Sequence, residues 1–165
     1  MKYDESAKFY SYEDTDQDLW LLFTHARYAV YRAREKELQI LRTSPEHVGV
    51  LFLVQALGDK ATPAEIARQI IRQPHSVSAL IERMAKKGLI KKVKDLERKN
   101  MVRVVLTDKG KKIYEASTMR GPIHHIMGEL SADEKKQFRK TLGKILTKAR
   151  KEIGLDGDNL PPSDI

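Results

Sequence analysis

The chain of 165 residues contains no cysteine. A disulfide framework, a cysteine-liganded zinc site and thiol-based redox sensing are therefore excluded. There is also no run of about 18 apolar residues, so no segment predicts a transmembrane helix. Residues 1–6 lack the apolar centre of a signal peptide. Together these absences predict a soluble protein of the cytoplasm.

Catalytic motifs are missing as well. The sequence has no glycine-rich phosphate loop, no arrangement that would activate a serine, and no metal-ligand spacing. His124 and His125 are adjacent, and neighbouring helical side chains point about 100° apart, so two such residues rarely share one ion. We therefore expect neither an enzyme nor a bound cofactor or metal.

What the chain does have is an uneven distribution of charge. The net charge is +8, but residues 60–112 contain 15 basic and 5 acidic residues, a local charge of +10. The remainder contains 16 basic and 18 acidic residues and is close to neutral. A basic segment can simply be a solvated surface. It can also be a surface that binds phosphates, and local structure has to decide between these two interpretations.

The basic segment begins with two short helices. Thr62 followed by Pro63 and Glu65 predicts an N-cap, a proline in the first turn and a capping box. Apolar residues then recur at helical spacing, namely Ile66, Ala67, Ile70 and Ile71. A second helix is predicted from Pro74 to Lys87, where Gly88 ends it.

The two faces of this second helix differ in chemistry. Its apolar face is formed by Val77, Leu80, Ile81 and Met84. Its other face carries small, polar and charged residues, namely His75, Ser76, Ser78, Ala79, Glu82 and Lys86. Such a face suits a helix that enters the major groove of DNA and touches base edges.

A basic hairpin follows the second helix. Residues 89–94 and 101–106 alternate apolar with polar side chains and predict two strands, with residues 95–100 as a polar tip. Thr107 is the expected N-cap of the next helix. Two helices followed by a basic hairpin predict a winged helix-turn-helix in a mainly α fold with a small β-wing, and this favours the phosphate-binding interpretation of the charge.

The order of these motifs resembles the multiple antibiotic resistance regulator (MarR) family. The resemblance rests on the segments TPAEIA, HSVSALIERMAKKGLI and RVVLTDKG, and it covers roughly residues 17–153. Two positions differ from the family pattern. Ala79 stands where many members have arginine, and Arg98-Lys99-Asn100 stands where an Asp-Arg-Arg or Asp-Lys-Arg triplet is frequent.

Amphipathic helices are predicted near both ends of the chain. The first carries an apolar stripe that includes Leu19, Leu22 and Phe23, and it reaches to about Leu41. The second follows a capping box formed by Ser131 and Glu134. Its apolar stripe consists of Phe138, Leu142, Ile145, Leu146, Ala149 and Ile153.

These two stripes can pack inside one monomer or against a second copy. A chain this small has little interior to cover helices at both ends, and the resemblance implies a dimer in which the first and last helices interlock. We therefore predict a homodimer on a palindromic site. The expected organisation is an N-terminal extension (1–16), dimerisation helices (17–43 and 112–153), a DNA-binding lobe (44–111) and a disordered tail (154–165).

The interpretation assigns residues to two kinds of site. DNA contacts are expected from Thr62, Arg72, His75, Ser76, Ser78, Ala79, Glu82, Arg83, Lys86, Lys94, Arg98, Lys99 and Arg103. The resemblance also implies a cleft for a small aromatic or anionic effector. Aromatic side chains that could line it are Trp20, His25, Tyr28, Tyr31 and Phe52, although an aromatic residue on an amphipathic helix more often belongs to the core.

The leading prediction is a sequence-specific, ligand-responsive transcription regulator that acts as a repressor and whose partner is double-stranded operator DNA. The alternative is an architectural protein that binds DNA without regard to sequence. Small polar residues on the second helix favour the first function, since pure phosphate binding would place more lysine and arginine there.

Overall fold

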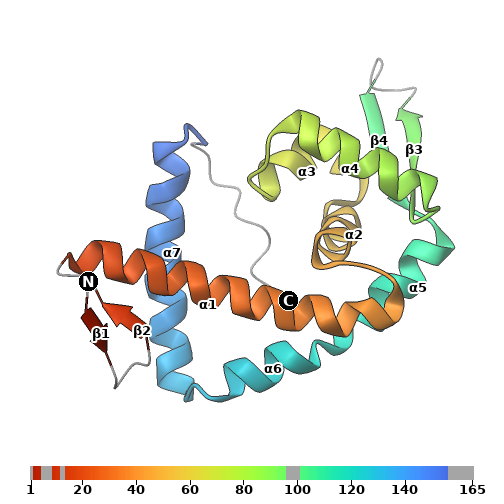
Figure 1. Cartoon of the computed structure of the whole chain (residues 1–165). Coiled ribbons are helices and arrows are strands. Elements are labelled where there is room, and N and C mark those ends of the chain that lie inside the picture. Colours follow the sequence, from red (N-terminus) through yellow and green to blue (C-terminus); the bar gives the residue numbers. More distant parts are fainter. Residues whose placement is uncertain (1, 5–8, 12–13, 96–100, 156–165) are drawn as a thin grey trace.

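A computed structural model describes residues 2–4, 9–11, 14–95 and 101–155. The described part is mainly helical with two small antiparallel sheets (Figure 1). Its elements, in order, are β1 (Lys2–Asp4), β2 (Phe9–Ser11), α1 (Thr15–Leu38), η1 (Gln39–Leu41), α2 (Pro45–Leu57), η2 (Gly58–Lys60), α3 (Pro63–Gln69), α4 (Pro74–Lys86), β3 (Ile90–Asp95), β4 (Met101–Leu106), α5 (Asp108–Ala116), η3 (Ser117–Met119), α6 (Gly121–Gly128) and α7 (Ala132–Glu152).

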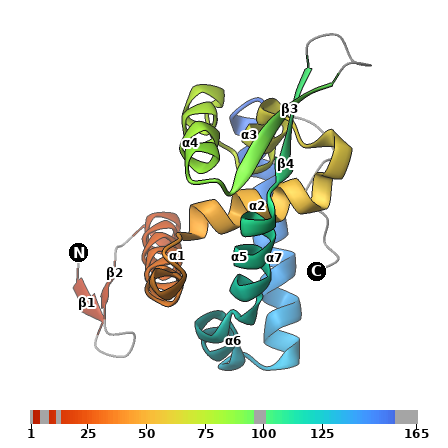
Figure 2. The same ribbon diagram turned by 90° about the vertical axis from the view of Figure 1, so that its right-hand side faces the viewer.

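The hydrophobic core lies in one lobe built from α2 to α5 and the β3–β4 hairpin (Figure 2). Its fully buried side chains come from α2, α3, α4 and the hairpin, and the largest include Leu51, Ile66, Leu80, Ile81 and Met84. Strands β3 and β4 pair in an antiparallel register from Ile90 opposite Leu106 to Asp95 opposite Met101. This arrangement is the winged helix-turn-helix that the sequence predicts.

Short polar side chains begin the helices of the lobe. The Thr62 hydroxyl accepts a hydrogen bond from the Glu65 amide at 3.1 Å, and the Thr107 hydroxyl accepts one from the Gly110 amide at 3.0 Å. The predicted capping box at Thr62 is only half formed. The Glu65 carboxylate accepts from Arg68 and Gln69 instead, because a planar guanidinium binds a carboxylate with two parallel bonds.

Helix α3 is shorter than the apolar stripe predicts. It ends at Gln69, and Ile71 lies outside it with φ of 55°. This left-handed conformation is unfavourable for a β-branched residue. It lets the Arg72 amide donate to the Ala67 carbonyl at 3.1 Å, which closes the turn between α3 and α4. Ile71 is therefore a turn residue and not part of the buried face of α3.

The ends of the chain differ in detail from the predicted boundaries. Helix α1 begins at Thr15, because the Asp14 carboxylate caps it by accepting from the amides of Asp16 and Gln17. The N-terminal extension contains the strand pair β1–β2. Helix α7 has the predicted capping box at Ser131 and Glu134. Of the predicted C-terminal tail, Gly154 and Leu155 close α7, and residues 156–165 lie outside the described part.

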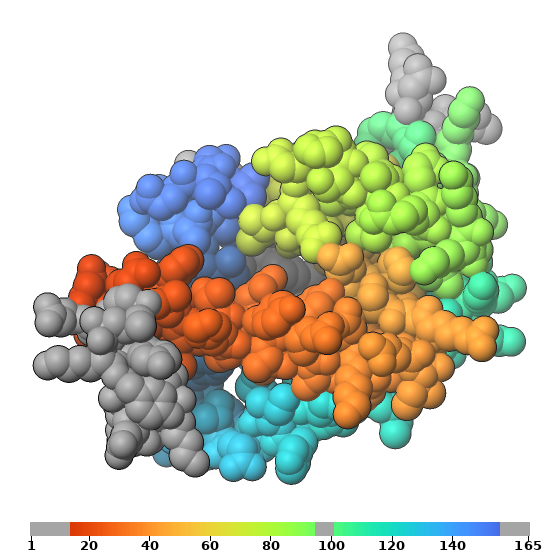
Figure 3. Space-filling view, in the orientation of Figure 1, coloured from red at the N-terminus to blue at the C-terminus, as the bar shows by residue number. Residues whose placement is uncertain are grey.

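The lobe and the long helices occupy different parts of the molecule. In the space-filling view α1 and α6 extend from the lobe, whereas one end of α7 lies beside it (Figure 3). Along α7 only Arg150 is buried, and every residue from 131 to 141 is exposed. The apolar stripe of α7 is thus left largely uncovered by the described part of its own chain.

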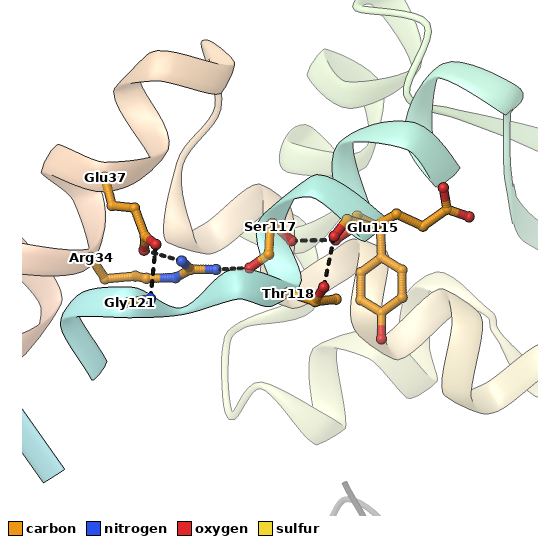
Figure 4. A network of polar contacts seen from close by, with 7 residues as sticks. Arg34, Glu37, Glu115, Ser117, Thr118 and Gly121 are labelled. Carbon is orange, nitrogen blue, oxygen red and sulfur yellow. Dashed lines mark hydrogen bonds and ion pairs between the residues drawn. The ribbon is translucent and has the colours of Figure 1, made fainter. Parts of the chain in front are cut away.

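A polar network joins α1 to the segment that follows α5 (Figure 4). The buried guanidinium of Arg34 pairs with Glu37 and donates to the Ser117 carbonyl. The Glu37 carboxylate also accepts from the Gly121 amide at 3.0 Å. These bonds attach α1 to both sides of the bend between α5 and α6.

Helix α5 is also fixed at its first turn, against the end of α4. The Thr107 hydroxyl donates to the Gly88 carbonyl at 2.6 Å, and the Lys109 ammonium donates to the Lys87 carbonyl at 2.8 Å. Gly110 lies so close to the residue before β3 that a Cβ atom there would be 2.0 Å from the Leu89 carbonyl oxygen. Only glycine fits at position 110 without a backbone shift.

We expect Gly110→Ala to lower the free energy of unfolding by about 2 kcal/mol or more, because the added methyl overlaps backbone atoms that cannot rotate away. Urea unfolding measures the change. Gly49→Ala is the control. It adds the same methyl in α2, where nothing lies within 4 Å, and should gain up to about 1 kcal/mol. Equal midpoints for the two variants would contradict the close contact.

Arg34→Ala should lower the free energy of unfolding by about 2–4 kcal/mol, because it leaves the Ser117 carbonyl and the Glu37 carboxylate without their buried donor. Arg32→Ala removes a similar pair on the same helix. Arg32 and Glu35 are also three residues apart, but the Arg32 side chain is 61% exposed, so the loss should stay within about 0.5 kcal/mol. Thermal or urea unfolding of both variants compares them directly.

Candidate nucleic-acid interface

Helix α4 separates its two faces as the sequence predicts. Val77, Leu80, Ile81 and Met84 are buried in the lobe. The opposite face is solvent-exposed over its whole length and consists of His75, Ser76, Ser78, Ala79, Glu82, Arg83 and Lys86. Because α4 lies at the surface of the lobe beside the hairpin (Figure 2), this face is available to a groove of DNA.

Local sequence determines where α4 begins and ends. Pro74 occupies its first turn, where the missing amide hydrogen has no helical partner to lose. Gly88 takes φ of 69°, and the Leu89 amide donates back to the Met84 carbonyl at 3.0 Å. This left-handed glycine turns the chain directly into β3. The exposed face of α4 and the hairpin are therefore held in a fixed relation.

Several cations of the lobe surface are paired with carboxylates from other elements. Arg72, in the turn after α3, pairs with Glu46 of α2. Lys92 of β3 pairs with Glu82 of α4. Arg103 of β4 pairs with Asp59 of η2. Lys86 lies four residues from Glu82 on α4, but the observed partner of Glu82 is Lys92 of the hairpin.

The other described residues predicted to contact DNA lie at the start of α3 and on the hairpin. Thr62 is half-buried and its hydroxyl serves as the cap of α3. Lys94 is exposed on β3, together with Lys91 and Lys92. Asp95, predicted to belong to the polar tip, is the last residue of β3. Arg98 and Lys99 lie outside the described residues.

Sequence reasoning missed the partners Glu46, Asp59 and Lys92. Glu46 and Asp59 precede the basic segment and carry no motif of their own. For Lys92 a signal was present, because alternation along a strand places Lys92 and Lys94 on the same side. The alternation alone does not predict how the strand packs beside α4, and this packing is what brings Lys92 to Glu82.

Two ionisable groups of the lobe, Glu65 of α3 and His47 of α2, have pKa values that are shifted by their surroundings. The side-chain hydrogen bond from Arg68 holds the pKa of Glu65 below its ordinary value, against a smaller opposing effect of burial. Burial, followed by the positive charges of Lys87 and Arg83, lowers the pKa of His47 and favours its neutral form. The Thr43 hydroxyl lies 3.4 Å from His47 Nδ1.

The five aromatic candidates for an effector site are not gathered around one described cavity. On α1, Trp20, His25 and Tyr28 are exposed, and Tyr31 is half-buried. Burial and the charge of Glu46 raise the pKa of the Tyr31 phenol. Phe52 of α2 packs against the core of the lobe, as the alternative interpretation of an aromatic helix residue expects.

Two described cavities are lined by other residues. One lies along α1 and is lined by Arg32, Ala33, Glu35, Lys36 and Gln39. The other, of about 470 Å³, lies between the turn after α3 and the end of α7, where Ile71, Arg72 and Ile153 meet. His124 and His125 are exposed on α6, and within the described residues no three His, Asp or Glu side chains are grouped as metal ligands.

The described helices include none that is both long and apolar enough to cross a membrane. A family model described as a winged helix DNA-binding domain matches residues 44–110, which is the lobe with α2 to the start of α5. The curated proteins include no significant match to the chain. Similarity to solved structures, in contrast, extends over nearly the whole chain.

The organohalide-sensing transcriptional regulator RdhR in its ligand-free form is 31% identical, with a TM-score of 0.78 over 98% of this chain and 95% of that one. Its form bound to 2,4-dichlorophenol is 33% identical, with a TM-score of 0.73 over 86% and 83%. A MarR-family regulator from Rhodococcus sp. RHA1 shares the fold at 18% identity, with a TM-score of 0.71 over 81% and 97%.

MepR of S. aureus, in a complex with DNA, also shares the fold at 24% identity, with a TM-score of 0.71 over 78% of this chain and 96% of that one. These similarities agree with the sequence motifs of the lobe and with its exposed helix α4 and wing. The chain belongs to the MarR family of winged helix-turn-helix, DNA-binding transcription regulators.

Proposed function

We propose that the protein is a ligand-responsive repressor that binds a palindromic operator as a homodimer. The observation that carries this proposal is the exposed face of α4. It offers small and polar side chains at Ser76, Ser78 and Ala79, and the basic residues Arg83 and Lys86 follow on the last turn of the helix. Short side chains allow the helix backbone to approach base edges closely, whereas the flanking cations suit phosphates.

Direct reading of bases fits the chemistry of this face. Ser76 and Ser78 can donate or accept, and Ala79 offers a methyl group that suits the methyl of thymine. His75 and Arg83 extend the same face at its two ends. Thr62, Arg72, Lys94 and Arg103 would contact the backbone around it, with Arg98 and Lys99 at the tip of the wing. Glu82 lies on the same exposed face.

The homodimer is supported by the uncovered helices. Exposed large apolar side chains occur along α1 and α7, among them Leu19, Leu22 and Phe23 on the former and Phe138 and Ile145 on the latter. A helix of 21 residues with one buried side chain gains little stability from its own chain. Interlocking α1 and α7 with a second copy would bury both stripes, with residues 17–43 and 112–153 forming the assembly and residues 44–111 reading DNA.

An effector is supported by the relatives. RdhR has been crystallised with 2,4-dichlorophenol, and CouR from Rhodococcus jostii RHA1 with p-coumaroyl-CoA. Both ligands contain an aromatic ring. We propose a small aromatic or anionic effector for this protein, with Trp20, His25, Tyr28 and Tyr31 as candidates for its contacts, since their rings lie on the helix that would also face a second copy.

The operator prediction is tested by selecting bound duplexes from a random pool at near-physiological salt. We expect an enriched inverted repeat whose half-sites lie about one helical turn apart. Ala79→Arg should raise general affinity and shift preference toward guanine at one position of each half-site, because arginine donates two bonds to guanine.

Gln137→Arg adds the same charge on an exposed position of α7 and should leave the base profile unchanged. If the selection enriches no inverted repeat, the result would instead favour an architectural protein that binds DNA without regard to sequence. A profile that Ala79→Arg does not alter would show that residue 79 faces away from the bases.

The homodimer prediction is tested by placing a carboxylate on the uncovered stripe. Ile145 is 50% exposed in the single chain, so Ile145→Asp should leave the monomer folded. In a dimer that buries this position the carboxylate costs several kcal/mol, which weakens association at least about a hundredfold. Sedimentation at micromolar concentration should give a dimer for the unchanged protein and for Thr147→Asp, an exposed control on the same helix, and a monomer for Ile145→Asp. An unchanged protein that sediments as a monomer would contradict the proposal.

A further inference from the structure

Glu82 is the one acidic residue in the sequence of α4, and it lies on the face that is proposed to meet DNA. Its carboxylate pairs with the ammonium of Lys92, which belongs to β3 of the wing. The pair therefore spans the two elements that would straddle the DNA backbone. The ammonium of Lys92 on the wing is therefore neutralised by the Glu82 carboxylate of the same lobe.

Carboxylates and phosphates compete for the same cations. Lys92 can bind a phosphate only after it leaves Glu82, and a phosphate that approaches Lys92 is also repelled by the nearby carboxylate. The exchange is feasible because the pair is accessible to water, with 38% of the Lys92 side chain and 54% of the Glu82 side chain exposed. Exposed pairs of this kind are held weakly, so a closely placed phosphate can displace Glu82.

Neighbouring positions of the lobe repeat the arrangement. Arg72 is paired with Glu46 and Arg103 with Asp59, and each pair again joins two different elements. Glu82 differs from these carboxylates by its position, because Glu46 and Asp59 are outside α4. It is thus the carboxylate whose charge acts directly on a DNA chain lying along α4.

We infer that Glu82 is a specificity-determining residue that acts against DNA of the wrong sequence. On such DNA, which α4 cannot approach closely, Lys92 stays with Glu82 and contributes no phosphate contact. On the operator, close docking of α4 brings a phosphate to Lys92 and displaces the carboxylate. The inference rests on the proposed docking of α4 in the major groove.

The test is Glu82→Gln, which keeps the shape of the side chain and removes its charge. Binding to a random-sequence duplex and to the selected operator is measured over a range of salt concentrations. Each added phosphate contact steepens the log–log salt dependence by about 0.9. We expect that steepening on random DNA, with an affinity about threefold to tenfold higher at low salt, and an unchanged slope on the operator.

Two controls make the result specific to the pair. Glu129→Gln removes the same charge from an exposed position at the end of α6, away from the lobe, and should leave both slopes unchanged. In a Lys92→Gln background, Glu82→Gln should no longer steepen the slope on random DNA, because the cation that it releases is absent.

The outcomes separate this inference from the proposed function. If Glu82→Gln binds random DNA with an unchanged slope, the inference is overturned while DNA binding stands. A changed base preference at one operator position with unchanged slopes would also overturn it, since Glu82 would then accept a hydrogen bond from a base. If the unchanged protein binds neither duplex, the proposed function itself fails.

Discussion

The burial of one face of α4 is the constraint on which the rest of the lobe depends. Val77, Ile81 and Met84 are fully enclosed, so α4 cannot rotate about its axis without exposing them. This fixed rotation determines which side chains face outward, and thereby what the protein can offer to DNA. The hairpin is placed by the same packing, because β3 follows Gly88 directly and Ile90 and Val104 enter the same core.

The sequence predicted those features that local rules determine. The two faces of α4, the hairpin strands and the caps at Thr107 and Ser131 follow from periodicity and from residues a few positions apart, and the structure confirms them. Features that depend on distant residues were not predicted. Lys92 meets Glu82 only through the packing of the hairpin beside α4, and Ile71 leaves its helix because the turn to α4 requires a left-handed residue there.

The long helices show a different limit of prediction. Their apolar stripes were evident from spacing, yet the described chain leaves Leu19, Phe138 and Ile145 exposed, so what covers these residues is not encoded in contacts within one chain. The same holds for the aromatic residues of α1. Trp20 and Tyr28 lie on a helix that would face a second copy under the proposed assembly. A cleft formed by two chains could not be predicted from the hydrophobic periodicity of one chain.

Helix α5 connects the end of α4 to the segment that is bonded to α1. Its first turn is bonded to the end of α4 through Thr107 and Lys109, and the segment at its other end is bonded to the buried guanidinium of Arg34 on α1. Nine helical residues span only about 14 Å and do not stretch. The angle at which α1 leaves the lobe is consequently fixed at both ends of α5. In the proposed homodimer, that angle would set the spacing between the two copies of α4.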